Sequence, residues 1–79
     1  MKKPVKKPLD KRVLKIAEKL KKMRIDKGHT SYENFAHDMD LPRVQYWRLE
    51  HGVNFRIESL LKVLDVHKIT LEDFFKGLK

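Results

Sequence analysis

The stretch that decides the fold is TSYENFAHDMDLPRVQYWRLEHG, residues 30–52. Ala36 is small at a position where a second helix would pass close to the backbone. Asp40 stands in the turn, where a residue with a left-handed backbone conformation is needed. Pro42 suits the first turn of the next helix, and Gly52 suits its end. Apolar side chains at the remaining inward positions are Phe35, Met39, Leu41, Tyr46 and Leu49. This order of apolar, small, turn and apolar positions predicts a helix-turn-helix unit.

Helical patterns continue on both sides of this unit. Asp10 is the expected N-cap of a first helix that stops near Gly28, and Thr30 with Ser31 offers the next cap. Residues 53–56 read as a loop before a fourth helix that starts at about Ile57. Thr70 caps a short last helix. The apolar faces expected are Val13, Ile16, Ala17, Leu20 and Met23 in the first helix, Ile57, Leu60, Leu61 and Leu64 in the fourth, and Leu71, Phe74, Phe75 and Leu78 in the fifth. The prediction is an all-α, five-helix domain.

Composition narrows the range of partners. The chain has 79 residues, enough for one domain. Its net charge of +8 favours a polyanion, either nucleic acid or an acidic membrane surface, and does not choose between them. Residues 1–8 form a basic arm ahead of a domain at 9–79. The arm either lies along DNA, where it adds salt-dependent affinity, or serves as a solubilising tail. No apolar run could span a bilayer, and there is no cysteine, so a cytoplasmic bacterial protein is expected.

At residues 30–52 the chain resembles the lambda-repressor-like family, the Cro and repressor (Xre-like) class of helix-turn-helix regulators. The resemblance extends from about Leu20 to Phe75 and includes IESLLKVL and TLEDFF, which match the fourth and fifth helices of that family. The sequence departs from the family pattern at Tyr32, where a phosphate-binding Gln is usual, at Asp40, which replaces the turn Gly, and at Trp47, which is larger than usual.

The resemblance makes the helix from Pro42 to Gly52 a recognition helix for the major groove of double-stranded DNA. Matched to the reading positions of the family, Arg43, Val44 and Arg48 are expected to contact bases, since Arg suits guanine and Val a thymine methyl group. The resemblance also implies an ion pair between Arg24 and Glu50, which would tie the first helix to the third. The side chains expected to contact the DNA backbone or groove are Ser31, Tyr32, Gln45, Trp47, His51, Asn54 and Arg56.

The last helix carries more large apolar residues than one core face requires. Leu71, Phe74, Phe75 and Leu78 are expected to be mostly core, with a remainder that forms a dimer patch, since repressors of this class bind matching half-sites as two-fold dimers. The histidines show no metal-ligand spacing, and no cofactor or metal is expected. His67 falls at a position where the family often has a core Leu, so a partly buried structural histidine is expected there.

Two functions of different classes remain. The first is sequence-specific binding of double-stranded DNA by a small bacterial or mobile-element transcriptional regulator, which is expected to be a repressor. The second is an antitoxin or adaptor whose main partner is another protein. Two Arg, a Gln and a Trp on the outward side of the third helix favour the first. An enzyme is the weakest reading, since the sequence shows no nucleophile–base pair, glycine-rich phosphate loop or metal cluster.

Overall fold

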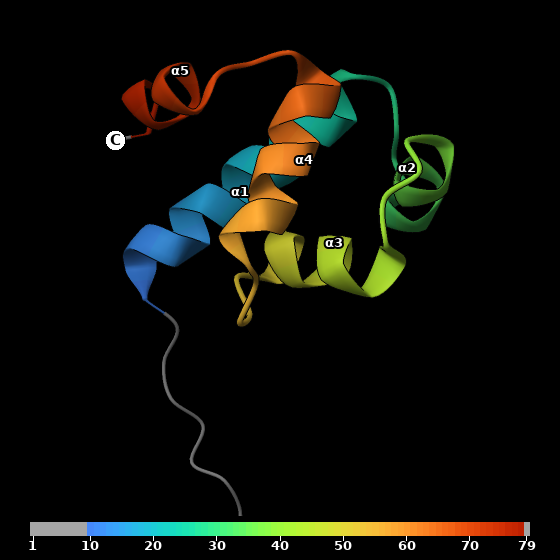
Figure 1. Cartoon of the computed structure of the whole chain (residues 1–79), viewed down its shortest axis with the longest axis horizontal. Coiled ribbons are helices and arrows are strands. Elements are labelled where there is room, and N and C mark those ends of the chain that lie inside the picture. Colours follow the sequence, from blue (N-terminus) through green and yellow to red (C-terminus); the bar gives the residue numbers. More distant parts are fainter. Residues whose placement is uncertain (1–9, 79) are drawn as a thin grey trace, which may run out of the picture.

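A computed structural model describes residues 10–78, and within that range every regular element is an α-helix (Figure 1). The predicted all-α, five-helix class is therefore confirmed. The proposed arm, residues 1–8, lies outside the described residues. The helices are α1 (Lys11–Asp26), α2 (Tyr32–Asp38), α3 (Arg43–His51), α4 (Ile57–His67) and α5 (Leu71–Lys76).

The caps that the sequence predicted fix the helix starts. The side chains of Asp10, Ser31 and Thr70 accept hydrogen bonds from the backbone N–H groups of Arg12, Asn34 and Asp73 at 2.8, 3.2 and 3.0 Å. Each bond satisfies one of the donors that a helix start leaves free. The bonds between Asp10 and Arg12 also lower the pKa of the Asp10 carboxyl to about 2.

The turn between α2 and α3 sets the angle at which the two helices meet. Asp40 has φ 58°, in the left-handed region, as the sequence predicted. The Leu41 N–H then donates to the Ala36 carbonyl at 2.8 Å and closes the end of α2. Ala36 is only 1% exposed, and α3 packs against α2 at this point. Gly52, with φ 66°, ends α3, and a Cβ there would lie 3.3 Å from Cγ1 of Val13.

Substituting Asp40 with glycine is expected to stabilise the fold. A left-handed conformation costs an L-residue more than it costs glycine, and the extra flexibility of glycine in the unfolded chain offsets part of the gain. We expect the free energy of unfolding in urea to rise by up to about 1 kcal/mol. A fall in stability would show that the Asp40 side chain contributes something beyond occupying the turn.

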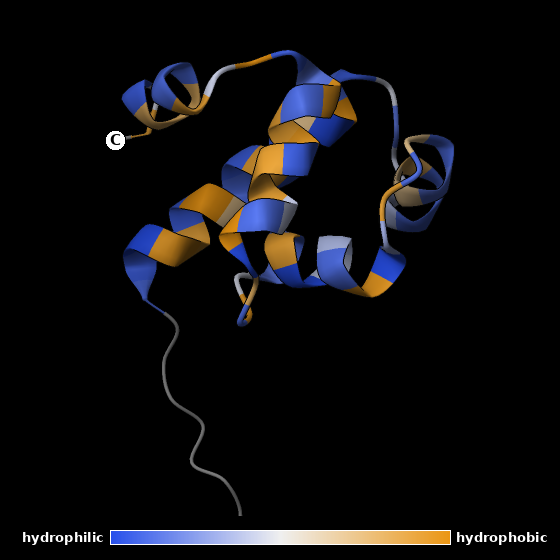
Figure 2. Ribbon diagram, viewed as in Figure 1, coloured by the Kyte–Doolittle hydropathy of each residue, from blue (hydrophilic) through white to orange (hydrophobic). Residues whose placement is uncertain are grey.

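All five helices contribute to the core, and Figure 2 shows apolar positions repeating along α1 and α4. Its buried side chains are Leu20, Phe35, Ala36, Tyr46, Leu49, Leu60, Val63, Leu64 and Phe74. The inward side of α4 differs from the prediction. Ile57 and Leu61 are 56% and 40% exposed, whereas Ser59 and Val63 are buried. Leu60, Val63 and Leu64 share one helix face, and α4 packs this face on the core and leaves the neighbouring face of Ile57 and Leu61 outside.

His67 lies against the Phe35 ring, with the ring centroids 5.5 Å apart, and its Nε2 is buried without a hydrogen-bond partner in the described structure. Burial lowers the pKa of His67, and the positive charge of Lys27 lowers it further. This agrees with the partly buried structural histidine expected from the sequence.

The His67 pKa leads to a prediction for the pH dependence of stability. Because the pKa of His67 is lower in the folded protein, the unfolded chain takes up this proton at a higher pH, near 6.5, than the folded protein does. Below that pH the unfolded state binds more protons, so the free energy of unfolding falls with pH, by at most about 1.4 kcal/mol per unit from this group. Urea unfolding of the wild type should show this loss, and His67→Leu should lack it. Parallel pH profiles of the two proteins would refute the assignment.

Candidate nucleic-acid interface

The outward side of α3 is an open surface. Tyr46 and Leu49 are 1% and 0% exposed, so they fix the side that faces the core. Arg43, Val44, Trp47 and Arg48 are exposed, and the exposed fraction of Val44 reaches 57%. The structure therefore leaves all three residues expected to read bases accessible on one short helix. We call the exposed side of α3 formed by Arg43, Val44, Trp47, Arg48 and His51 the outer face of α3.

Arg43 and Glu33 connect this face to α2. Nη1 of Arg43 lies 3.4 Å from Oε2 of Glu33, and both side chains are more than half exposed. A contact of this length between two solvated groups holds the guanidinium weakly. The Arg43 side chain therefore remains free to exchange this partner for another acceptor.

Trp47 and His51 form a stacked aromatic pair one helical turn apart. Their ring centroids are 4.0 Å apart with the planes tilted by 17°, and Nδ1 of His51 lies 2.8 Å from the Trp47 carbonyl oxygen. Trp47 remains 37% exposed. The pair therefore presents a fixed aromatic surface near the C-terminal end of the outer face.

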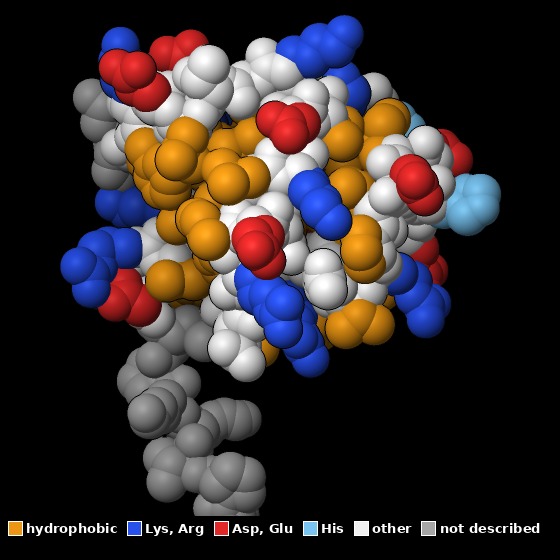
Figure 3. All heavy atoms as spheres, in the orientation of Figure 1, with side chains coloured by type: hydrophobic (Ala, Val, Ile, Leu, Met, Phe, Trp, Pro, Cys, Tyr) orange, Lys and Arg blue, Asp and Glu red, His pale blue; other side chains and the backbone are white. Residues whose placement is uncertain are grey.

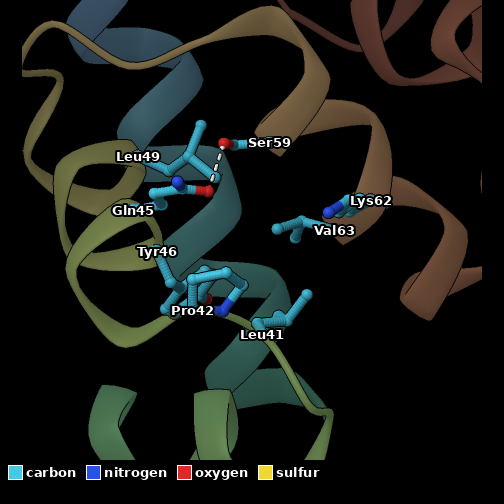
Figure 4. Close-up of a pocket in the computed structure, with 8 residues that line it drawn as sticks. All are labelled: Leu41, Pro42, Gln45, Tyr46, Leu49, Ser59, Lys62 and Val63. Atoms are coloured by element: carbon cyan, nitrogen blue, oxygen red, sulfur yellow. Dashed lines mark hydrogen bonds between the residues drawn. The ribbon is translucent and has the colours of Figure 1, made fainter.

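Gln45 departs from the predicted outward set. It is half-buried, and its side-chain oxygen accepts a hydrogen bond from Oγ of Ser59 at 3.0 Å (Figure 4). That bond joins α3 to the first turn of α4, and it leaves the NH₂ group of Gln45 available as a donor. The sequence analysis did not assign a role to Ser59, because the inward positions predicted for this helix did not include it.

A basic hollow lies beside this bond. It has a volume of about 390 Å³ and is lined by Gln45, Arg56, Glu58, Ser59 and Lys62. An adjoining hollow of about 70 Å³ adds Arg48, Asn54 and Phe55. Asn54, at φ 41°, and Arg56 are exposed as expected, and Lys62 is a cation that the sequence analysis did not single out. The hollows bring together Arg48, Arg56 and Lys62 with one carboxylate, Glu58, so cations predominate, a combination suited to phosphate groups.

Ser31 and Tyr32 begin α2. Ser31 caps the helix, as described above, and Tyr32 is half-buried with its ring packed against the core. The groups left for the predicted phosphate contacts are therefore the backbone N–H groups at the start of α2 and the hydroxyl of Tyr32.

Arg24 and Glu50 form the ion pair that the family resemblance implied. Nε and Nη2 of Arg24 donate to the two Glu50 oxygens at 2.6 and 2.9 Å, and Nη1 donates to the His29 carbonyl at 2.9 Å. The two side chains are 5% and 3% exposed. The hydrogen bonds to Glu50 raise the pKa of the Arg24 guanidinium. The pair joins α1 to the C-terminal half of α3 and so holds the outer face in place.

The sequence was compared with known proteins. It is 34% identical over 67 residues to Control protein C.MunI of Mycoplasma sp., and the match covers 84% of this chain and 90% of that protein. The chain belongs to the control-protein family. It is accordingly a small transcriptional regulator of the helix-turn-helix type. No protein-family model and no solved structure matches the chain.

This control-protein chain also carries an apolar surface away from α3. Figure 3 shows hydrophobic side chains gathered beside α4. Leu71 and Phe75 of α5 are 41% and 39% exposed, and Ile57 and Leu61 of α4 add to the exposed apolar area. Phe74 belongs to the part of the α5 set that was expected in the core and adds nothing to an exposed patch. It is completely buried because it faces the core and lies under Lys19, whose Nζ donates to the Phe74 carbonyl at 2.8 Å.

The remaining histidines show no arrangement typical of a metal site. Between residues 10 and 78, no three metal-ligating side chains come close enough to hold an ion. Nε2 of His29 and Nδ1 of His37 each lie 3.6 Å from the Asp38 carboxylate. Nor does the described part of this control-protein chain contain a helix long and apolar enough to cross a membrane.

Proposed function

We propose that the protein binds a specific sequence of double-stranded DNA through the outer face of α3, placed in the major groove, and represses transcription by occupying that site. The observation that carries this proposal is the exposure of Arg43, Val44 and Arg48 on one side of a helix whose other side is fixed in the core. Recognition helices contact base edges mainly through their N-terminal residues, where Arg43 and Val44 lie. Arg pairs well with guanine, and Val with a thymine methyl group.

Contacts with the DNA backbone surround this reading surface. The basic hollow includes Gln45 of α3 together with Arg56 and Lys62, and Ser31 and Tyr32 begin α2, which packs against α3. Phosphate contacts of this kind position a recognition helix without reading sequence. Together with the net charge of +8, they account for salt-dependent affinity.

The apolar surface of α4 and α5 suits a second copy of the chain. Ile57, Leu61, Leu71 and Phe75 are exposed, and Leu78 is half-buried. Two such faces would bury one another and set two α3 helices on the half-sites of a palindrome. Monomeric mass in sedimentation with and without DNA would count against this dimer.

The family suggests which genes are regulated. The relative is a control protein, a class of helix-turn-helix regulators of restriction–modification systems. We propose that this chain controls a system of the same kind. Genes for a DNA methyltransferase and an endonuclease next to its own gene would support this proposal, and their absence would count against it.

The test of the function is selection from a random DNA pool at two salt concentrations. The proposal predicts a palindromic consensus that survives the higher salt, with affinity at least about a thousandfold above that for unselected DNA. Binding that is sequence-blind and disappears with salt would contradict it. In that case the antitoxin or adaptor function, in which the main partner is another protein, would become the better account.

A further inference from the structure

The hydrogen bond between His51 and Trp47 fixes the protonation pattern of the imidazole. Nδ1 of His51 lies 2.8 Å from the Trp47 carbonyl oxygen, and a carbonyl oxygen can only accept. Nδ1 therefore carries the hydrogen. A neutral imidazole has a single N–H group, so Nε2 of neutral His51 is an acceptor.

This pattern limits what His51 can bind. Phosphate oxygens of DNA also only accept, so neutral His51 has no donor to offer a phosphate through Nε2. Once Nε2 is protonated, the ring becomes both a cation and a donor, and it can make a charge-assisted hydrogen bond to phosphate. The neutral ring could instead accept from the amino group of adenine or cytosine.

The position of His51 favours phosphate over a base. It is the last residue of α3, whereas the N-terminal residues of a recognition helix reach the base edges. The ring is exposed and stacked on Trp47 at 4.0 Å, so its orientation is fixed. The indole face and the carbonyl end of α3 both interact favourably with positive charge at this place.

The charged groups near this end of α3 leave His51 without an acidic partner. Glu50, its neighbour on α3, is turned to Arg24. The start of α1 meets Gly52 through Val13 and Leu14, and the acidic residue at that start, Asp10, is bonded to Arg12. Arg48 on α3 and Arg56 in the following loop are cations. Among the ion pairs of residues 10–78, none includes His51.

We propose that His51 is a proton-gated phosphate ligand: it takes up one proton at Nε2 from solvent when the protein binds DNA, and Nε2–H then donates to a backbone phosphate while Nδ1–H stays on the Trp47 carbonyl. This inference rests on the proposed DNA-binding function. Its consequence is a DNA affinity that rises as pH falls through the range in which histidine titrates.

The test is the affinity for the selected duplex between about pH 8 and about pH 6, at fixed salt. Wild type should bind about tenfold more tightly at the lower pH, with at most a tenfold change per pH unit for one linked proton. His51→Ala should lose the rise, whatever its affinity at the upper pH. His37→Ala, which removes a histidine that is exposed on α2, should keep it. Circular dichroism at each pH checks that the chain stays folded.

The outcomes separate this inference from the function on which it rests. A rise that persists in His51→Ala, or that disappears in His37→Ala, would overturn the role of His51 and leave specific DNA binding intact. A fall in affinity toward low pH would also overturn it, since that is the behaviour of a neutral acceptor at a base. If no duplex were bound selectively at any pH, the proposed function would fail together with the inference.

Discussion

Arg24→Ala is expected to remove most of the protein's stability at room temperature. The substitution leaves the Glu50 carboxylate, which is 3% exposed, as an unpaired buried charge, and it also removes the donor to the His29 carbonyl. Breaking a buried pair in this way costs about 3–5 kcal/mol. A domain of this size has only about 5 kcal/mol or a little more to lose. Thermal unfolding followed by circular dichroism measures the effect.

Two further variants distinguish a buried pair from a merely charged surface. Replacing both partners with apolar residues, Arg24→Met with Glu50→Leu, should recover much of the loss, because no isolated charge is left inside. Lys22→Ala removes a cation from the exposed pair with Asp26 and should leave the unfolding midpoint almost unchanged. If Arg24→Ala unfolded at the wild-type midpoint, the pair would not tie α1 to α3 as described.

The second large effect is expected on DNA selectivity. Arg43→Ala and Arg48→Ala should each weaken binding to the selected duplex by about 1–3 kcal/mol, which is about 5- to 150-fold. Each should also relax the preference for one base pair, since the paired donors of the guanidinium are lost. Competition assays with single-base variants of the consensus measure both changes.

Cations outside the outer face of α3 provide the matched controls. Lys62→Ala removes a cation from the basic hollow and should weaken binding to all duplexes alike. It should also reduce the dependence of affinity on salt concentration. Lys76→Ala, at the end of α5, should change neither quantity. Glu33→Gln tests the contact with Arg43 and should leave the base preference intact. If Arg43→Ala weakened every sequence equally, Arg43 would be a phosphate ligand and not a reader of bases.

The local backbone chemistry of the fold was predictable from the sequence. Asp10, Ser31 and Thr70 cap helices, Asp40 takes the left-handed turn, and Gly52 ends α3. Each of these depends on one residue and its immediate neighbours. The Arg24–Glu50 pair is different, because the residues are 26 positions apart and only the family resemblance implied their contact.

Other features could not be predicted because they depend on how helices are placed. α4 has apolar residues on a broad arc, and only its packing against α3 decides that Val63 is buried and Leu61 exposed. The bond between Gln45 and Ser59 has the same origin. The stacking of Trp47 on His51 was within reach of the sequence, since residues four apart share a helix face.

Trp47 is the only tryptophan of the chain and lies on the outer face of α3, so its fluorescence reports directly on that surface. The decisive measurement is the quenching of Trp47 fluorescence by a neutral quencher, in the free protein and in the protein saturated with the selected duplex. If α3 enters the major groove, bound DNA will shield the indole and quenching will fall several-fold. Unchanged quenching at saturation, with Trp47 as accessible as in the free protein, would contradict the placement of α3 against DNA.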